Sequence, residues 1–198
     1  GTFAHRRTRE GTKRMTASTN SPITPADEGV IGEHNDGRAF IRFERHLDHP
    51  VERVWASLTE PDQIIQWLCH RVEIEPKVGG HFTMWLGATD GEEPEETGQI
   101  TIFEPPRLLE SAEDDGSTLR WELRPQGTGC LLTFTDTRPL GERASNSVRA
   151  GWHLRMEQLP EALNGRPTDW VALDATRTEH DAIARIEEIY WHYRNQPR

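Results

Sequence analysis

The chain has 198 residues, of which 34% are hydrophobic and 28% charged, and its formal net charge is -10 at pH 7. A chain of this length has room for one well-buried core with extensions, which favours a single domain. No stretch approaches the roughly 18 apolar residues of a membrane span, and the net acidity argues against a nucleic-acid partner. Two cysteines, Cys69 and Cys130, are too few for a disulfide framework, which favours a cytoplasmic protein.

The first part of the sequence lacks any structural period. Residues 1–37 are rich in Thr, Ser, Pro, Gly and charged residues, and they follow neither the two-residue repeat of a strand nor the 3.6-residue repeat of a helix. We therefore expect a disordered lead-in, with the fold beginning at residue 38. The basic residues among the first 15 could form a binding arm, but disorder is the simpler interpretation.

Regular patterns start at residue 39. Alternation of apolar and polar residues over 39–47 predicts a half-buried strand, and Pro50 suits the first turn of a helix that Glu60-Pro61 ends. A second short helix is expected over 62–68. Alternation then returns in six short runs separated by turn signals, which predicts antiparallel strands near residues 72–74, 82–86, 100–102, 108–109, 119–123 and 130–134.

One long helix is expected after the strands. Apolar residues recur at helical spacing from Val148 to Leu163, and Asn164-Gly165 provides a stop signal. These elements can bury their apolar faces together only if the sheet curves around the helix. We therefore predict an α+β helix-grip fold, in which a seven-stranded antiparallel curved sheet surrounds the long C-terminal helix. A single helix rarely fills the concave side of such a sheet, so a cavity is expected between them.

Several motifs resemble, in order, those of the Hsp90-ATPase-activator-homologue family of the START/Bet v 1-like superfamily. The resemblance covers residues 38–164 and is carried by HPVERVW at 49–55, LTEP at 58–61, Trp67, EPKVGGHF at 75–82, GQI at 98–100, EPPRL at 104–108, GCLLTF at 129–134 and GW at 151–152. It implies the helix-grip fold. It also implies Hsp90 as a partner, but weakly, because no segment resembles the separate N-terminal domain of the eukaryotic activators.

The expected cavity is the candidate ligand site. Its predicted lining consists of inward-facing apolar residues with two polar additions, namely Phe43, Arg45, Trp67, Met84, Trp121, Phe134, Trp152, His153, Met156 and Leu159. Tryptophan and methionine suit a flat or flexible apolar ligand, although each could simply be core. Arg45 could bind a ligand carboxylate, with ion pairing inside the fold as the alternative.

The residues offer little for metal or covalent chemistry. The nearest histidine pair, His46 and His49, lacks further convergent ligands, and no nucleotide or cofactor motif is present, so neither metal nor cofactor is predicted. Both cysteines are expected in the core. His153 is the candidate acid–base group if the cavity supports a cyclase or hydrolase, and a helix-flank histidine otherwise.

Residues 165–198 are expected to form a linker and an amphipathic helix with Ile183, Ile186, Ile189 or Tyr190, and Tyr193 on one face. This face either docks on the domain or forms a homodimer through residues 179–194. Overall, the sequence favours non-enzymatic binding of an apolar small molecule or lipid. The alternatives are regulation of an Hsp90-type ATPase and, third, cyclase or hydrolase activity.

Overall fold

A computed structural model of the chain describes residues 22–86, 93–170 and 181–196, and its fold is α+β. Within these ranges eight strands form one antiparallel sheet in the order β1-β2-β8-β7-β6-β5-β4-β3. The strands are β1 (Val30–Glu33), β2 (Ala39–Leu47), β3 (Arg71–Ile74), β4 (His81–Trp85), β5 (Glu96–Glu104), β6 (Leu108–Glu113), β7 (Thr118–Gln126) and β8 (Gly129–Thr137). The helices are α1 (Val51–Thr59), α2 (Pro61–Ile64), α3 (Asn146–Leu163) and α5 (Asp181–Arg194).

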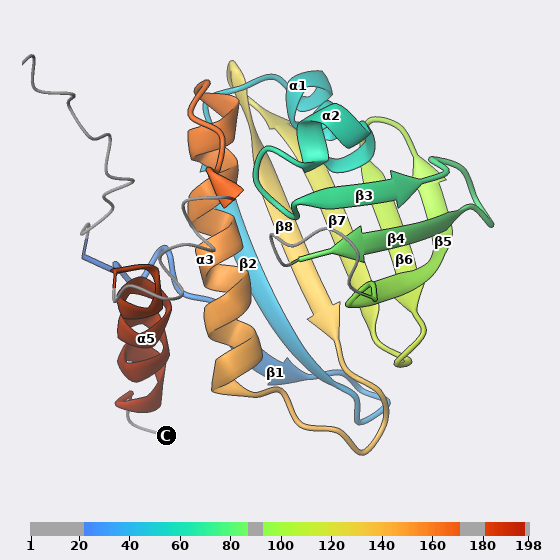
Figure 1. The fold of residues 1–198 in the computed structure, drawn as a ribbon. Coiled ribbons are helices and arrows are strands. Elements are labelled where there is room, and N and C mark those ends of the chain that lie inside the picture. The colour runs from blue at the N-terminus through green and yellow to red at the C-terminus, as the bar shows by residue number, and fades with distance from the viewer. Residues whose placement is uncertain (1–21, 87–92, 171–180, 197–198) are drawn as a thin grey trace, which may run out of the picture.

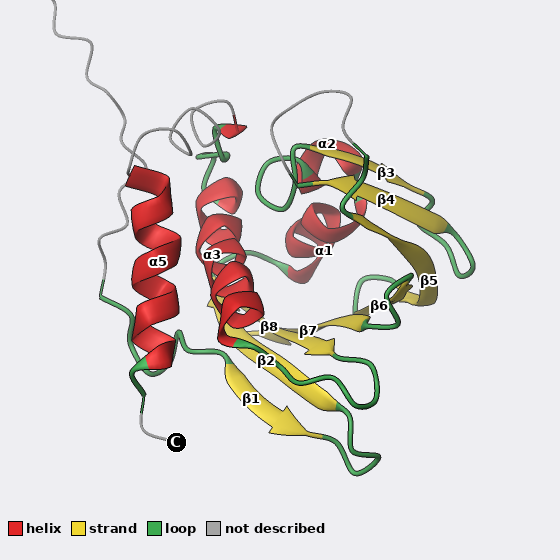
Figure 2. Ribbon diagram, turned by 60° about the horizontal axis from the view of Figure 1, so that its bottom comes forward, coloured by secondary structure: helices red, strands yellow, loops and turns green. Residues whose placement is uncertain are grey.

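The sheet curves, and its helices lie on one side of it (Figures 1 and 2). The long helix α3 crosses the concave face near β2 and β8, while α1 and α2 close the same face at the other end. Helix α5 lies beside α3, beyond the edge of the sheet that β1 forms. This is the helix-grip arrangement that the sequence predicted.

Local signals explain where the helices begin and end. Pro50 precedes α1, and Glu52 in the first turn complements the positive end of the helix dipole. Helix α3 starts at a capping serine, because the Oγ of Ser145 accepts a hydrogen bond from the N–H of Val148 at 3.2 Å. It ends at Asn164, and Gly165 follows with a φ of +78°, which a side chain would disfavour.

The sheet has eight strands rather than the seven predicted, because β1 lies inside the segment that was expected to be disordered. Val30–Glu33 pairs antiparallel with Ala39–Arg42. Two glycines allow this pairing: a Cβ at Gly29 would collide with the ring of Phe43, and one at Gly32 with the ring of Phe40. The strand could not be read from its own four residues, because its stability comes from these rings and from β2.

Two smaller differences concern the helices. Helix α2 ends at Ile64, whereas the sequence predicted a helix to residue 68, and turns follow it to Leu68. The predicted C-terminal helix is present as α5, and residues 171–180 before it lie outside the described residues. No helix within the described ranges is both long enough and apolar enough to cross a membrane.

Candidate functional site

The apolar residues predicted to line a cavity lie together between the sheet and α3, where they form the main core. Phe43, Trp67, Phe134, Met156 and Leu159 are at most 1% exposed. Met84 and Trp121 are also buried, and Trp152 packs against the same cluster while remaining partly exposed. The structure therefore brings these eight residues together in one packed cluster, and their role as a ligand lining stays a prediction.

An aromatic row forms the centre of this cluster. The ring of Trp121 lies 5.8 Å from that of Trp67 and 4.2 Å from that of Phe134, and Phe134 in turn lies 4.2 Å from Trp152. The row runs from the enclosed side under α1 and α2 to the partly exposed indole of Trp152 on α3. Tilted and edge-to-face pairs of this kind add to the stability gained by burial.

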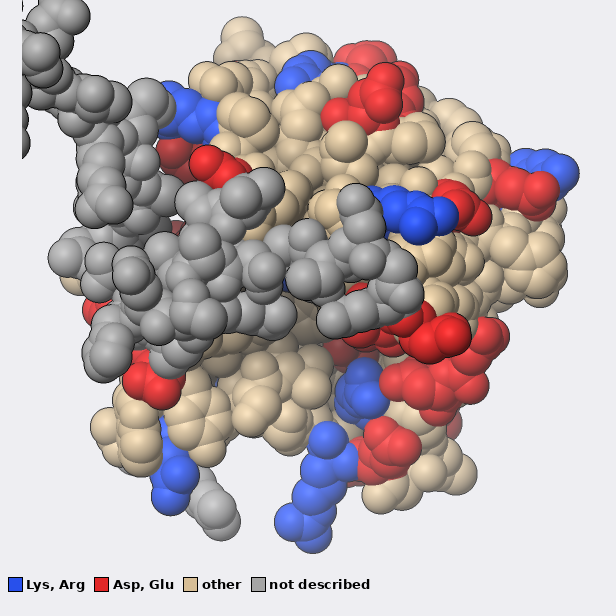
Figure 3. Space-filling model, viewed as in Figure 1, with Lys and Arg blue, Asp and Glu red and all other residues tan. Residues whose placement is uncertain are grey.

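The polar end of this row was not predicted. The Nε1 of Trp152 donates a hydrogen bond to the Oδ2 of Asp136 at 2.9 Å, and Asp136 is only 1% exposed. On the same face of the sheet lie Glu113 at the end of β6 and Glu96 at the start of β5. Figure 3 shows acidic side chains gathered over the ends of β4, β5 and β6.

Burial governs the charge of these carboxyls. It raises the pKa of Glu113 to about 8, and the negative charge of Glu96 adds to the effect, although a hydrogen bond from the Oγ of Ser117 at 2.8 Å opposes it. Burial likewise raises the pKa of Glu96 and of Asp136. Glu113 is therefore mainly protonated at neutral pH and can donate a hydrogen bond.

Arginine 138 partly compensates this acidic group. Its guanidinium lies 3.5 Å from the Oδ1 of Asp136, 3.3 Å from Asp115 and 3.4 Å from Glu142. Asp136 can therefore accept from both Trp152 and Arg138. These contacts place Asp136 at the polar end of the aromatic row, and Glu113 lies on the same face of the sheet.

Arg45 and His153, the two polar residues predicted to line the cavity, are engaged elsewhere. The Nη2 of Arg45 donates to the main-chain oxygen of Asp27 at 2.7 Å, in the segment before β1. His153 is 0% exposed between α3 and α5, where its Nδ1 contacts the hydroxyl of Tyr193 at 2.5 Å. Both are covered by extensions of the chain whose positions the sequence patterns could not reveal.

The remaining reactive groups are inert in this arrangement. Within the described residues no three His, Cys, Asp or Glu side chains are placed to hold a metal ion. Cys69 and Cys130 are free and buried, and burial raises the pKa of Cys69 to about 12. A thiol with so high a pKa is a poor nucleophile at neutral pH.

The comparison with protein families now identifies the domain. The model of the activator of Hsp90 ATPase homolog 1-like protein family matches residues 48–164, more than half of the chain. The chain belongs to this family. The family is part of the START/Bet v 1-like superfamily, and the helix-grip fold agrees with it. None of the curated proteins compared with the chain matches it.

Solved structures agree with this assignment. CalU16 from Micromonospora echinospora is 21% identical and has a TM-score of 0.63, over 84% of this chain and 95% of that chain. A Mesorhizobium loti protein is 25% identical, with a TM-score of 0.54 over 65% and 99% of the two chains. The Aha1 dimer from Colwellia psychrerythraea is 14% identical, with a TM-score of 0.54 over 64% and 97%.

The acidic end of the site did leave a signal in the sequence. Strand β8 alternates through Leu132 and Phe134 toward the core, and the same alternation places Asp136 on that face. Likewise Leu109 predicts an inward Glu113, four residues further along β6. Taken one at a time, both carboxyls resemble the exposed acidic residues that commonly end a strand. Only their place in the alternation of inward and outward residues indicates that they face the core.

Proposed function

We propose that this chain binds a small, largely apolar molecule between the sheet and α3, with the polar part of the ligand at Glu113 and Asp136. The observation that carries the proposal is the set of carboxyls with raised pKa on the concave face. Burying acids of like charge reduces stability, and such groups concentrate at functional sites. A purely structural core would be served better by apolar residues at these positions.

The chemistry of the ligand follows from the two carboxyls. Protonated Glu113 can donate a hydrogen bond to a carbonyl or hydroxyl oxygen, while Asp136 can accept one from a hydroxyl or an amine. Trp152 offers an aromatic surface next to Asp136, which suits a flat ring system. We therefore infer a ligand with an apolar, ring-containing body and a hydroxyl or carbonyl at one end.

The residues around the candidate site favour ligand binding over catalysis. His153, which a cyclase or hydrolase could have used as an acid–base group, is enclosed between two helices and bonded to Tyr193. Glu113 could still act as a proton donor toward a bound ligand, but no activated nucleophile lies among the described residues of the site. We therefore place binding ahead of a cyclase or hydrolase activity.

The test uses N-phenyl-1-naphthylamine, a neutral apolar dye, as the probe. We expect saturable fluorescence enhancement with the wild-type chain and about tenfold weaker binding for Trp152→Leu, since the variant loses an aromatic contact and apolar area. Trp191→Leu is the matched control, because Trp191 is 49% exposed on α5, and its affinity should be unchanged. Enhancement that does not saturate, or equal loss in both variants, would contradict the proposal.

Regulation of an Hsp90-type ATPase is the second candidate, and family membership is the observation in its favour. Such regulation would need a contact on the protein surface and would not need a ligand bound between the sheet and α3. Mixing the chain with Hsp90 from the same source should then change the ATPase rate, and Trp152→Leu should leave that change intact. An unaltered ATPase rate at saturating concentrations of the chain removes this candidate.

A further inference from the structure

A pocket of about 290 Å³ lies on the outer face of the sheet, opposite α3. Thr135 and Thr137 point into it, and they alternate along β8 with Phe134 and Asp136, which face α3. The pocket is thus separated from the candidate site by the thickness of the sheet. Its volume is at the lower end for ligand sites, so it suits a small metabolite rather than a drug-sized molecule.

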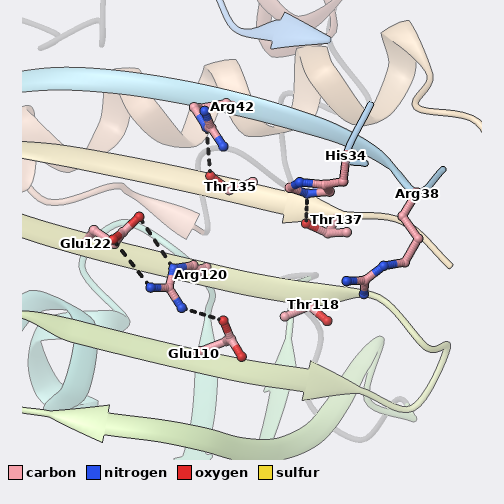
Figure 4. Close-up of a pocket in the computed structure, with 9 residues that line it drawn as sticks. All are labelled: His34, Arg38, Arg42, Glu110, Thr118, Arg120, Glu122, Thr135 and Thr137. Atoms are coloured by element: carbon pink, nitrogen blue, oxygen red, sulfur yellow. Dashed lines mark hydrogen bonds and ion pairs between the residues drawn. The ribbon is translucent and has the colours of Figure 1, made fainter. Parts of the chain in front are cut away.

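Strand register arranges the pocket in two rows, which Figure 4 shows side by side. In the first row Arg42 of β2 lies opposite Thr135, which lies opposite Arg120 of β7. In the second row Thr137 lies opposite Thr118. The turn between β1 and β2 adds His34 above Thr137 and Arg38 at the end of the pocket.

The two threonines at the base of the pocket are covered by longer side chains. Thr135 and Thr137 are only 4% and 7% exposed, although they lie on the outer face. The Nε of Arg42 donates to the Oγ1 of Thr135 at 3.2 Å, and the Nε2 of His34 lies 3.0 Å from the Oγ1 of Thr137. The residues around the hollow are therefore held in place by mutual contacts, unlike those of a flat solvated sheet face.

The charges in the pocket are unevenly compensated. Arg120 forms ion pairs with Glu110 at 2.8 Å and Glu122 at 3.4 Å, and Arg38 pairs with Asp36 at 2.8 Å. Within the described part of the chain no carboxylate is recorded within ion-pair distance of Arg42. Its guanidinium stands 4.7 Å from the centre of the Phe40 ring, which orients it.

We propose that this pocket binds a small oxyanion, a carboxylate or a phosphate monoester, whose body carries hydroxyl groups. The Nη atoms of Arg42 would hold the anionic oxygens, since an arginine fork matches their geometry. The ligand hydroxyls would meet the carboxylates of Glu110 and Glu122. Of the lining residues, His34, Arg38 and Arg42 precede the family match at residues 48–164, and the other six lie within it.

The experiment titrates glycerol 3-phosphate, and separately gluconate, into the ¹⁵N-labelled chain while amide resonances are followed by NMR. We expect saturable shifts at the outer-face positions of β2, β7 and β8, and the stronger of the two probes identifies the preferred anion. Arg42→Gln should weaken that binding about tenfold, because it removes a charge-assisted contact. Arg42→Lys keeps the charge but loses the fork, and should show an intermediate affinity.

Arg124→Gln is the matched control. Arg124 is exposed on the same face of β7 and lies outside the pocket, so its loss removes the same charge and should change the affinity less than twofold. If Arg42→Gln does not fold, the comparison of Arg42→Lys with Arg124→Gln decides. Absence of saturable shifts with both probes, or equal losses in the Arg42 and Arg124 variants, overturns the proposal.

Discussion

The charge of Glu113 depends on the fold. An exposed glutamate titrates near 4.5, whereas burial and the neighbouring Glu96 raise the pKa of Glu113 to about 8 in the folded chain. Between these two pH values the folded state holds a proton that the unfolded state has released. Folding stability from this group is therefore complete below about pH 4.5 and is lost progressively as the pH rises through 8.

Replacing this carboxyl should flatten the pH dependence. The unfolding free energy of the wild type should fall relative to that of Glu113→Gln by about 1 kcal/mol per pH unit between pH 5 and 8, because one proton distinguishes the two states. Urea unfolding at several pH values measures this difference. Glu44→Gln, at an exposed position of β2, is the control. Parallel curves for wild type and Glu113→Gln would show that Glu113 is ionised in the folded chain.

At the scale of elements, α5 is fixed to the domain by a chain of buried polar contacts. The hydroxyl of Tyr193 accepts a hydrogen bond from the N–H of Gly29 at 2.9 Å and can donate its own proton to the Nδ1 of His153. His153 then carries its proton on Nε2, which faces a carboxylate oxygen of Glu157 at 3.4 Å. That separation is long for a hydrogen bond, so the Nε2 group is only weakly satisfied.

Removing the hydroxyl tests this attachment. Tyr193→Phe should lower the unfolding free energy by about 1–3 kcal/mol, because it leaves the buried N–H of Gly29 without an acceptor. Hydrogen exchange should quicken in α5 and in β1. Tyr190→Phe is the matched control, since among the described residues the hydroxyl of Tyr190 accepts one long hydrogen bond, from Arg194 at 3.4 Å. Equal stability of the two variants would mean that the Tyr193 hydroxyl is not what holds α5.

The elements that could be predicted from the sequence are those whose pattern is local. Strands β2 to β8 alternate strongly, and Val148 to Leu163 keeps a helical period, so the helix grip followed from them. Strand β1 has no such pattern, because its pairing depends on residues of β2. The directions of Arg45 and His153 also depend on distant segments, since the N-terminal segment and α5 cover them.

The apolar part of the candidate site could be predicted from the sequence, and its polar part could not. Trp121 and Phe134 are recognisable as core from alternation alone. Glu113 and Asp136 stand out only because neighbouring elements bury them, and burial raises the pKa of each carboxyl. The outer pocket combines single residues of β2, β7 and β8 with a turn, so strand register had to be known before it could be seen.

At the scale of the whole molecule, the homodimer through residues 179–194 stays a prediction. Ile189 and Tyr193 are buried against the chain's own domain, which leaves Ile186 and Trp191 exposed, at 36% and 49%. If a dimer forms, it should use these two residues, and Trp191→Ser should weaken it about tenfold or more, as loss of a central aromatic contact does. Sedimentation velocity over a concentration series measures this. A wild-type chain that remains monomeric throughout removes the dimer.

The contacts between the two ends of the described chain have a consequence for aggregation. Arg149 of α3 donates to the main-chain oxygen of Gly29 at 2.7 Å and also to the side chain of Gln196, just beyond α5, so the segment before β1 is held against α3. Strand β1 in turn occupies the hydrogen-bonding edge of β2. An open edge of this kind recruits strands from other molecules. If these contacts were lost and β1 were released, the four-residue edge strand β1 would be replaced by the nine-residue β2, and a longer open edge pairs more readily with strands of other molecules.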